Sequence, residues 1–190
     1  MSELLSTVQG RRSYSHVTNT APNHDEILRL VAAAGRVADH SALRPWRIIE
    51  IRADARDIVG EALIEAGDLH GHDAEKQLGK VRRAPLLLAI VAVHRPSGKV
   101  PEWEQDAVTA GVAHTLSLLL HDAGWGVIWR TGALTRSDAV SRAHGLAAHE
   151  QLLGWLYVGG IPDGEETGHR TSIDADEFVS ILGAAPSAGI

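Results

Sequence analysis

Residues 99–106 read Lys-Val-Pro-Glu-Trp-Glu-Gln-Asp, residues 124–134 read Gly-Trp-Gly-Val-Ile-Trp-Arg-Thr-Gly-Ala-Leu, and a long apolar segment lies between them. Pro101 suits the start of a helix, where its missing N–H would be unpaired anyway. The acidic residues that follow complement the positive end of the helix dipole. Gly124 suits the end of the same helix. The sequence therefore predicts one helix from about residue 102 to residue 123.

Two faces of this predicted helix carry no charged side chains. One face is small and neutral, with Ala107, Ala110, Gly111, His114 and Ser117, and the other is apolar, with Val108, Val112, Leu116, Leu119 and Leu120. A helix without a broad charged face is usually buried on most sides. We predict that this helix forms the core of the domain and touches a second subunit. The central helix of a monomer would show the same periodicity, so this alternative stays open.

The segment after the helix, residues 125–129, is short and apolar, as expected for a buried strand. It ends in Arg130, Thr131 and Gly132. A cation, a hydroxyl group and a flexible backbone at the end of a buried strand are common components of an anion or cofactor site.

The composition is ordinary for a folded protein. The chain has 190 residues, 44% of them hydrophobic and 22% charged, so we expect a single domain over residues 1–190. A net charge of −6 does not indicate a nucleic-acid partner, and the absence of cysteine excludes disulfides and thiolate chemistry. Because we find neither a signal-peptide pattern nor an apolar run long enough for a membrane, we expect a cytoplasmic protein without a membrane partner.

The N-terminal residues 2–10 have the pattern of a short amphipathic helix, with Leu4, Leu5 and Val8 directed inward. The helix leads into Arg11-Arg12-Ser13. This triplet suits a phosphate group, because guanidinium groups offer forked donors and serine adds a hydroxyl. Simple charge balance at a helix end is the competing interpretation.

The rest of the chain alternates between predicted helices and strands. The expected elements are a helix over 24–37 capped by Asn23 with Glu26 as its box partner, a strand over 46–51, a helix over 53–83 broken near 67–71, a strand over 85–93, a helix over 135–144 capped by Thr135, a strand over 153–159, and a short strand or arm over 176–182 within a C-terminal arm of about 171–190. This alternation predicts an α/β (α+β) fold. The polar loop over 38–45 is a natural place for binding groups.

Several familiar signatures of other enzymes are absent from the sequence. No Gly-x-Gly-x-x-Gly follows a strand, and there is neither a Walker loop nor a Gly-x-Ser-x-Gly elbow. The 11 histidines are scattered without the spacing of metal ligands, so we predict no metal site.

Five motifs follow one another in the order in which the flavin-dependent nitroreductase family carries them. They are Arg11-Arg12-Ser13, Ala38-Asp39-His40 with Arg44-Pro45-Trp46, Pro101-Glu102-Trp103-Glu104-Gln105, residues 126–134, and residues 153–162. Together they span nearly the whole chain, which resembles the compact bacterial NAD(P)H nitroreductases of that family.

The resemblance implies a nitroreductase-like central mixed sheet of four to five strands covered by helices, in a homodimer. It also implies FMN bound non-covalently at the dimer interface and NADH or NADPH as the electron donor. The cofactor-binding residues implied are Arg11, Arg12, Ser13, Arg36, His40, Trp129, Arg130 and Thr131. No catalytic side chain is expected, because the flavin carries the chemistry.

Two positions depart from the wider family. Ala42 and Arg44 stand where many members carry Asn and Gln, so the amides that can reach the pyrimidine edge of the flavin are missing. Arg44 is retained as a candidate flavin contact that could replace part of that role, and a solvent-facing Arg44 is the alternative.

We therefore predict an FMN-dependent NAD(P)H oxidoreductase that reduces nitroaromatic or quinone-like small molecules by a ping-pong cycle. The alternative, from a different functional class, is a flavin-binding or flavin-storage protein with little turnover. We also predict that residues 178–182, which are apolar but too few to form a core, pack on the partner subunit.

Overall fold

The computed structural model describes residues 2–164 and 173–183. Its helices are α1 (Glu3–Gly10), α2 (His24–Ala34), α3 (Ala55–Ala66), α4 (Gly71–Val81), α5 (Glu102–Asp122) and α6 (Asp138–Ala143). Its strands are β1 (Trp46–Arg52), β2 (Leu86–Val93), β3 (Trp125–Arg130) and β4 (Glu150–Gly160). Among these described helices, none is both long and apolar enough to cross a bilayer.

The four strands form one sheet in the order β1-β2-β4-β3, and each neighbouring pair is antiparallel. The predicted α/β (α+β) class is confirmed, but the expectation of a mixed sheet is wrong for the described residues. Arg52 ends β1 directly opposite Leu86, which begins β2. The connection through α3 and α4 thus returns to the end of the sheet at which β1 stops. Strand β2 must therefore run antiparallel to β1. An alternation of helices and strands does not fix this direction.

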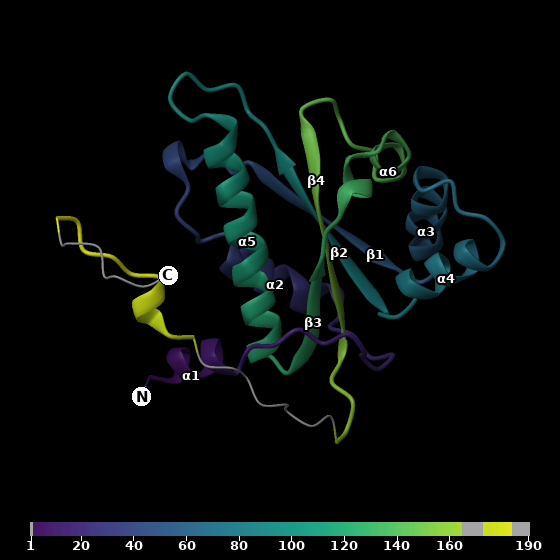
Figure 1. Ribbon diagram of the computed structural model, residues 1–190, viewed down its shortest axis with the longest axis horizontal. Coiled ribbons are helices and arrows are strands. Elements are labelled where there is room, and N and C mark those ends of the chain that lie inside the picture. The colour runs from purple at the N-terminus through teal and green to yellow at the C-terminus, as the bar shows by residue number, and fades with distance from the viewer. Residues whose placement is uncertain (1, 165–172, 184–190) are drawn as a thin grey trace.

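Helices cover both faces of the sheet (Figure 1). On one face, α2 and α5 pack Ile27, Val112 and Leu116 against it. On the other face, the cluster includes Val59 of α3 and Val140 of α6. All eight residues of β2 are buried, which confirms the strand predicted from its continuous apolar run.

Helix α5 has the predicted bounds within one residue and the predicted ends. Pro101 is its N-cap residue, and Gly124 follows with a φ of 84°. The prediction that α5 is buried on most sides is wrong for the single chain. Ala107 and His114 of the small face are exposed, and so is Trp103, by 68%. The cause is that α5 forms an outer layer on one face of the sheet, so the packing within one chain covers only one side of the helix.

Two further apolar segments have no cover from the described part of the chain, and the first of them is α1. The expected inward side of α1 is wrong, because Leu4, Leu5 and Val8 are 67%, 45% and 47% exposed. The contact of α1 with the body of the protein includes the hydrogen bond from Thr7 Oγ1 to Asp122 Oδ1, 2.9 Å, and its apolar side faces away from the core. This placement leaves α1 beside the C-terminal end of α5 (Figure 1).

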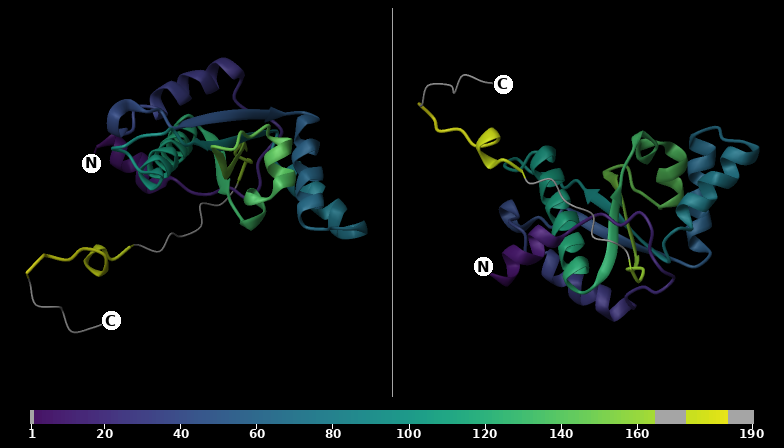
Figure 2. Two further views of the ribbon diagram at one scale, coloured as in Figure 1. Left: turned by 90° about the horizontal axis from the view of Figure 1, so that it is seen from above. Right: turned by 60° about the horizontal axis from the view of Figure 1, so that its bottom comes forward.

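The second segment is the described part of the C-terminal arm, residues 173–183, which contains one 3₁₀ turn (Ala175–Glu177) and no strand. Phe178, Ile181 and Leu182 are largely exposed. The short strand expected over 176–182 is thus absent here, since no described strand of this chain lies beside it to pair with it. Figure 2 shows the segment standing away from the body of the molecule. Residues 171, 172 and 184–190 of the predicted arm lie outside the described residues.

Two helix caps differ in part from the prediction. Asn23 does cap α2, accepting from the N–H of Glu26 at 2.9 Å, but the Glu26 carboxylate accepts instead from Trp125 Nε1 at 2.7 Å. Helix α6 is capped by Ser137 rather than Thr135. Thr135 lies in a preceding 3₁₀ turn, and its hydroxyl donates to the carbonyl of Gly132 at 2.7 Å.

One ion pair joins two strands that are not neighbours. Arg47 of β1 reaches over β2 to Glu150 of β4 and makes two parallel bonds of 2.6 and 2.7 Å. Hydrogen bonding from Arg47 lowers the pKa of the Glu150 carboxyl to about 2, with help from the N–H of Ala147 at 3.0 Å. The pair therefore stabilises the fold only while Glu150 is ionised.

We predict that Glu150→Gln destabilises the protein at pH 7 by roughly 1.5–3 kcal/mol, the range for hydrogen bonds to charged groups. Because the pKa of Glu150 is lower in the folded state, the ion pair contributes its full stabilisation only above the ordinary carboxyl pKa, here 4.5. This stabilisation is lost as the pH falls towards about 2. Urea unfolding at one protein concentration should therefore show the difference between wild type and variant shrinking from pH 5 to pH 3.

Glu65→Gln is the matched control, because Glu65 pairs with Arg142 where both side chains are more than 60% exposed. Glu65→Gln should lower the free energy of unfolding by less than about 1 kcal/mol. Equal effects of the two substitutions at pH 7 would contradict the assignment.

Candidate functional site

The loop that joins α2 to β1 is held in an unusual backbone conformation. The carboxylate of Asp39 accepts from the N–H groups of Leu43, at 3.1 Å, and Arg44, at 2.7 Å. Ser41, Ala42 and Arg44 have φ angles of 65°, 50° and 48°. L-residues other than Asn and Asp seldom adopt these angles, and such strain is concentrated at functional sites. At the positive φ of position 42, Asn would therefore be less strained than Ala42.

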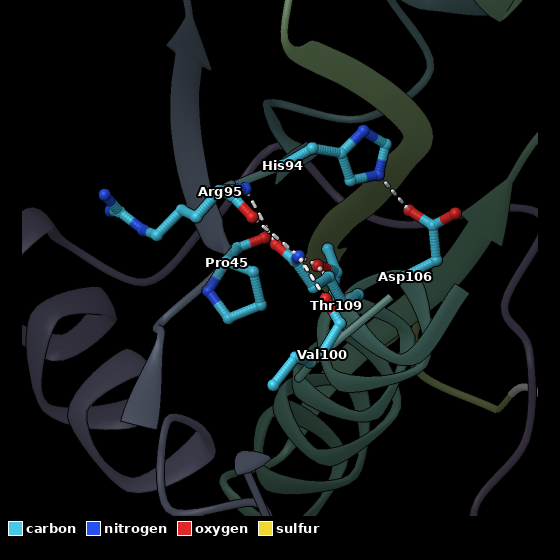
Figure 3. Close-up of polar contacts among 7 residues, drawn as sticks. Pro45, His94, Arg95, Val100, Asp106 and Thr109 are labelled. Carbon is cyan, nitrogen blue, oxygen red and sulfur yellow. Dashed lines mark hydrogen bonds and ion pairs between the residues drawn. The ribbon is translucent and has the colours of Figure 1, made fainter. Parts of the chain in front are cut away.

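The far end of the same loop is anchored to α5 (Figure 3). The carbonyl of Pro45 accepts from Thr109 Oγ1 at 2.9 Å and from the N–H of Val93 at 2.8 Å. Gln105, one turn earlier, is 1% exposed and bonds both the N–H and the carbonyl of Arg95. These buried bonds attach both loops, 38–45 and 94–101, to the first turns of α5.

His40 projects from this loop onto α5. Its Nδ1 lies 3.0 Å from Oε2 of Glu104, in the first turn of the helix. The two side chains border a groove of about 410 Å³, whose other lining includes Val37, Trp103, Ala107 and Gly111. The exposed small face of α5 is thus the floor of a groove that His40 flanks.

The end of β3 directs neighbouring side chains to opposite faces of the sheet, as the strand period requires. Trp129 lies on the α5 side, edge-on to the ring of His114 at 5.0 Å between centroids. The guanidinium of Arg130 lies over the ring of Tyr157, 5.4 Å from its centroid. Arg130 and Thr131 line a cavity of about 430 Å³ together with Leu63, Lys80, Trp155 and Tyr157. Burial raises the pKa of the Tyr157 phenol, so that it stays protonated.

Two buried donors at this strand end, Trp129 Nε1 and Arg130 Nε, have no hydrogen-bond partner among the residues that the structure describes. Gly154 of β4 lies against Trp129 Nε1 and the carbonyl of Arg130, with a φ of 129°, next to an irregularity in the pairing of β2 with β4. A Cβ at Gly154 would lie 2.3 Å from the carbonyl oxygen of Arg130 and 2.9 Å from Trp129 Nε1. Unpaired buried donors are costly. The unpaired indole N–H beside a backbone approach that only glycine permits, with a second unpaired donor on the other face of the strand end, fits a ligand that offers acceptors.

The Arg11-Arg12-Ser13 triplet lies at the other end of α5. Tyr14, directly after it, donates its N–H to the carbonyl of Val127 at 3.1 Å and stacks on His121. The Cα of Gly10, directly before it, is close enough to His121 that an added Cβ would lie 3.6 Å from Nε2. The triplet is therefore held between the C-terminal end of α5 and the start of β3.

The predicted site residues are thus divided along α5. Seventeen residues separate Glu104, next to His40, from His121, next to the triplet. At about 1.5 Å per residue, the two places lie about 25 Å apart along the helix axis. The strand end with Trp129 lies between them, opposite His114.

The two remaining predicted site residues flank the loop of His40. Arg36 is exposed just after α2 and precedes Val37, which faces Gly111 near the middle of α5. Arg44 is exposed, and its backbone N–H donates to the Asp39 carboxylate. The guanidinium of Arg44 is thus not needed to hold the loop in place.

Sequence reasoning missed several contributors to this region. The sequence indicates Glu104 only as a favourable charge in a first helical turn, although the side chain contacts His40. Asp39 and Gly154 carry no sequence signal for their roles, because their importance depends on strain and close approach, which no pattern reports.

A further cavity, of about 850 Å³, lies between residues 94–105 and the turn before β4. Its lining contains none of the predicted site residues. Within the described residues, no three His, Cys, Asp or Glu side chains are grouped as a metal site requires.

Comparison with known proteins places the chain in a family. The model described as the nitroreductase family matches residues 8–160. A protein of Escherichia coli K12 with the provisional name NAD(P)H nitroreductase YdjA is 31% identical over 161 residues, which cover 83% of this chain and 87% of that protein. A Haemophilus influenzae protein with the provisional name NAD(P)H nitroreductase is 27% identical over 187 residues, 95% of this chain and 100% of that protein.

Solved structures show the same fold. A nitroreductase-like family protein from Bacillus cereus matches with a TM-score of 0.81 at 19% identity, covering 97% of this chain and 98% of that one. A provisionally named nitroreductase from Desulfovibrio desulfuricans, solved in complex with FMN, matches with a TM-score of 0.72 at 19% identity, covering 94% and 96%. Because the family match extends over residues 8–160, this chain belongs to the nitroreductase family, as its motifs predicted.

Proposed function

We propose that the protein is an FMN-dependent NAD(P)H oxidoreductase that reduces small nitroaromatic or quinone-like acceptors. The observation that carries the proposal is the unpaired buried donor Trp129 Nε1 beside the glycine cradle at Gly154, with a second unpaired donor, Arg130 Nε, on the opposite face of the same strand end, all within the described residues. An isoalloxazine ring has carbonyl oxygens and ring nitrogens that accept hydrogen bonds, and such acceptors are the partners that these donors lack. Family membership supports the same conclusion, as do the names of the relatives and the FMN in the Desulfovibrio protein.

The division of the candidate residues along α5 supports a site built by two chains. Held at its phosphate by Arg11, Arg12 and Ser13, one FMN would not extend to His40 of the same chain, about 25 Å further along the helix axis. If a two-fold axis passes through the exposed small face of α5, the α5 helices of the two chains would pack against each other in antiparallel orientation. The N-terminal end of one helix, with His40 and Arg36, would then lie near the triplet of its partner. The homodimer would thus form two flavin sites.

In this arrangement the protein binds and orients while bound FMN supplies hydride acceptance and donation. The guanidinium groups of Arg11 and Arg12 neutralise a phosphate, and Ser13 adds a hydroxyl donor. The indole N–H of Trp129 would donate to the region where negative charge develops on reduction, and Arg130, on the other face of the strand end, would add positive charge nearby, which would stabilise the reduced state. Thr131 adds a hydroxyl at the exposed strand end. The donor nucleotide and the acceptor molecule then occupy the same open face in turn, which gives a ping-pong cycle.

We predict that the purified protein is yellow, and that anaerobic NADH or NADPH bleaches its flavin absorbance within the time of a single turnover assay. Subsequent addition of a nitroaromatic or quinone should restore the colour, because the acceptor reoxidises the flavin. Protein that retains FMN but is bleached only over hours would favour flavin storage. Protein that does not bind added FMN would contradict the proposal.

We predict that Arg12→Ala and Arg130→Ala each weaken FMN binding by roughly ten- to a hundredfold, because charge-assisted bonds contribute about 1.5–3 kcal/mol. Flavin fluorescence on dissociation, at one salt concentration, measures this. Arg95→Ala is the control, since Arg95 is exposed in the loop after β2 and belongs to no predicted contact. If all three variants match wild type, the phosphate and flavin assignments are wrong.

We predict that the protein sediments as a dimer at micromolar concentration, and that truncation after Asp176 loosens that dimer. The exposed side chains of Phe178, Ile181 and Leu182 would otherwise be left in water, and their burial on the partner contributes about 1.5–3 kcal/mol for each fully covered side chain. Sedimentation equilibrium compares the full chain with the truncated one. A species of only 20.3 kDa, or an unchanged dimer after truncation, would count against this assembly.

A further inference from the structure

We propose that Glu104 is a positioning residue, which fixes His40 so that its Nε2 is presented to the flavin as a hydrogen-bond acceptor. The inference rests on the proposed function and adds a role for a carboxylate outside the predicted flavin contacts. The direct observation is the contact of 3.0 Å between His40 Nδ1 and Glu104 Oε2. The two side chains are 56% and 29% exposed, so the pair lies at the surface of the groove rather than in the core.

Both partners are mounted on rigid backbone. Glu104 lies in the first turn of a 21-residue helix, and its N–H bonds the carbonyl of Pro101 at 3.1 Å. His40 lies in the loop whose two ends are held by Asp39 and by the bond from Thr109 to Pro45. The position of the imidazole relative to α5 is therefore set before any ligand arrives, as precise binding sites require.

The carboxylate also selects the tautomer of the imidazole. An ionised Glu104 can only accept, so Nδ1 of His40 must carry the proton that joins them. In the neutral ring Nε2 is then an acceptor, and it is the ring nitrogen left for a ligand. FMN carries matching donors, a ring N–H and the ribityl hydroxyls. Without Glu104 the ring would be free to rotate and to place its proton on Nε2, which would oppose the same bond.

The geometry distinguishes Glu104 from a second glutamate in the same helical turn. Glu102 occupies the same first turn and serves the dipole equally, but it lines the larger cavity beside residues 94–97 instead of the groove of His40. Of the two, Glu104 alone lines that groove together with His40 and Trp103. Comparison of the two glutamates therefore separates positioning of His40 from general electrostatics.

The test is a double-mutant cycle on FMN affinity, with the full-length protein and FMN itself as the probe. Glu104→Ala and His40→Ala should each weaken binding about three- to tenfold, the range for one hydrogen bond. Glu104→Ala should cause no further loss in the His40→Ala background, because its effect passes through the imidazole. Glu104→Gln, whose amide oxygen can still accept from Nδ1, should recover most of the affinity. Glu102→Ala should remain within about twofold of wild type.

Nitrogen NMR of uniformly labelled protein gives a readout independent of turnover. At a pH above the histidine range, the signals that disappear in His40→Ala should show a protonated Nδ1 and a bare Nε2 in wild type. In Glu104→Ala these signals should change to a mixture of tautomers, and in Glu102→Ala they should not change.

Additive losses in the cycle, or unchanged tautomer signals in Glu104→Ala, would overturn the inference while leaving FMN binding intact. Wild-type protein without FMN affinity would instead overturn the proposed function, and the role of Glu104 towards flavin with it. Thermal unfolding of each variant identifies any loss that arises from misfolding. Since Glu104→Gln keeps the size and the acceptor of the side chain, failure of that variant to recover affinity in a folded state would also contradict the inference.

Discussion

The length of α5 is the constraint on which the rest of this structure depends. As a single helix of 21 residues, it packs one side on the sheet and separates the loop of His40 from the Arg11-Arg12-Ser13 triplet by about 25 Å along its axis. A rigid helix cannot bring its two ends together. Residues that belong to one ligand site can therefore meet only if the second end is supplied by another chain, with its own α5 running in the opposite direction.

The surfaces left open by the single chain are consistent with that arrangement. The outer side of α5, the apolar side of α1 and the described arm over 173–183 all lie on the α5 side of the molecule, away from α3 and α4 (Figures 1 and 2). Each exposes large or small apolar side chains, among them Leu4, Trp103 and Phe178. Contiguous exposed apolar surface commonly marks an interaction site. The described fold thus has a core on one side and uncovered apolar side chains on the other.

Much of this fold could be predicted from the sequence, because its elements carry strong local signals. The buried run of β2, the proline start of α5 and the Asn23 cap of α2 all occur where periodicity and capping place them. Strand direction could not be predicted, since helix and strand order is the same for parallel and antiparallel sheets. The inward side predicted for α1 is wrong for a related reason, because an apolar stripe shows that a surface is to be covered and not which chain covers it.

The candidate site divides in the same way. Motifs indicated Trp129, Arg130 and the Arg11-Arg12-Ser13 triplet as candidates, and these residue types already favour an anionic or acceptor-rich ligand. The structure adds what depends on long-range geometry, namely the pairing of His40 with Glu104, the strained loop clamped by Asp39 and the close approach of Gly154. None of these follows from spacing, because each joins residues from different elements or depends on a backbone angle.

The most direct test of a site shared between two chains is FMN titration of a purified mixed dimer, in which one chain carries Arg12→Ala and the other His40→Ala. If each flavin touches the triplet of one chain and the His40 loop of its partner, one of the two sites combines both intact halves. The mixed dimer should then bind one FMN with wild-type affinity and a second one much more weakly, whereas neither parent homodimer has a wild-type site. If both sites of the mixed dimer are weakened, each flavin is held within a single chain, and a site shared across the dimer is ruled out.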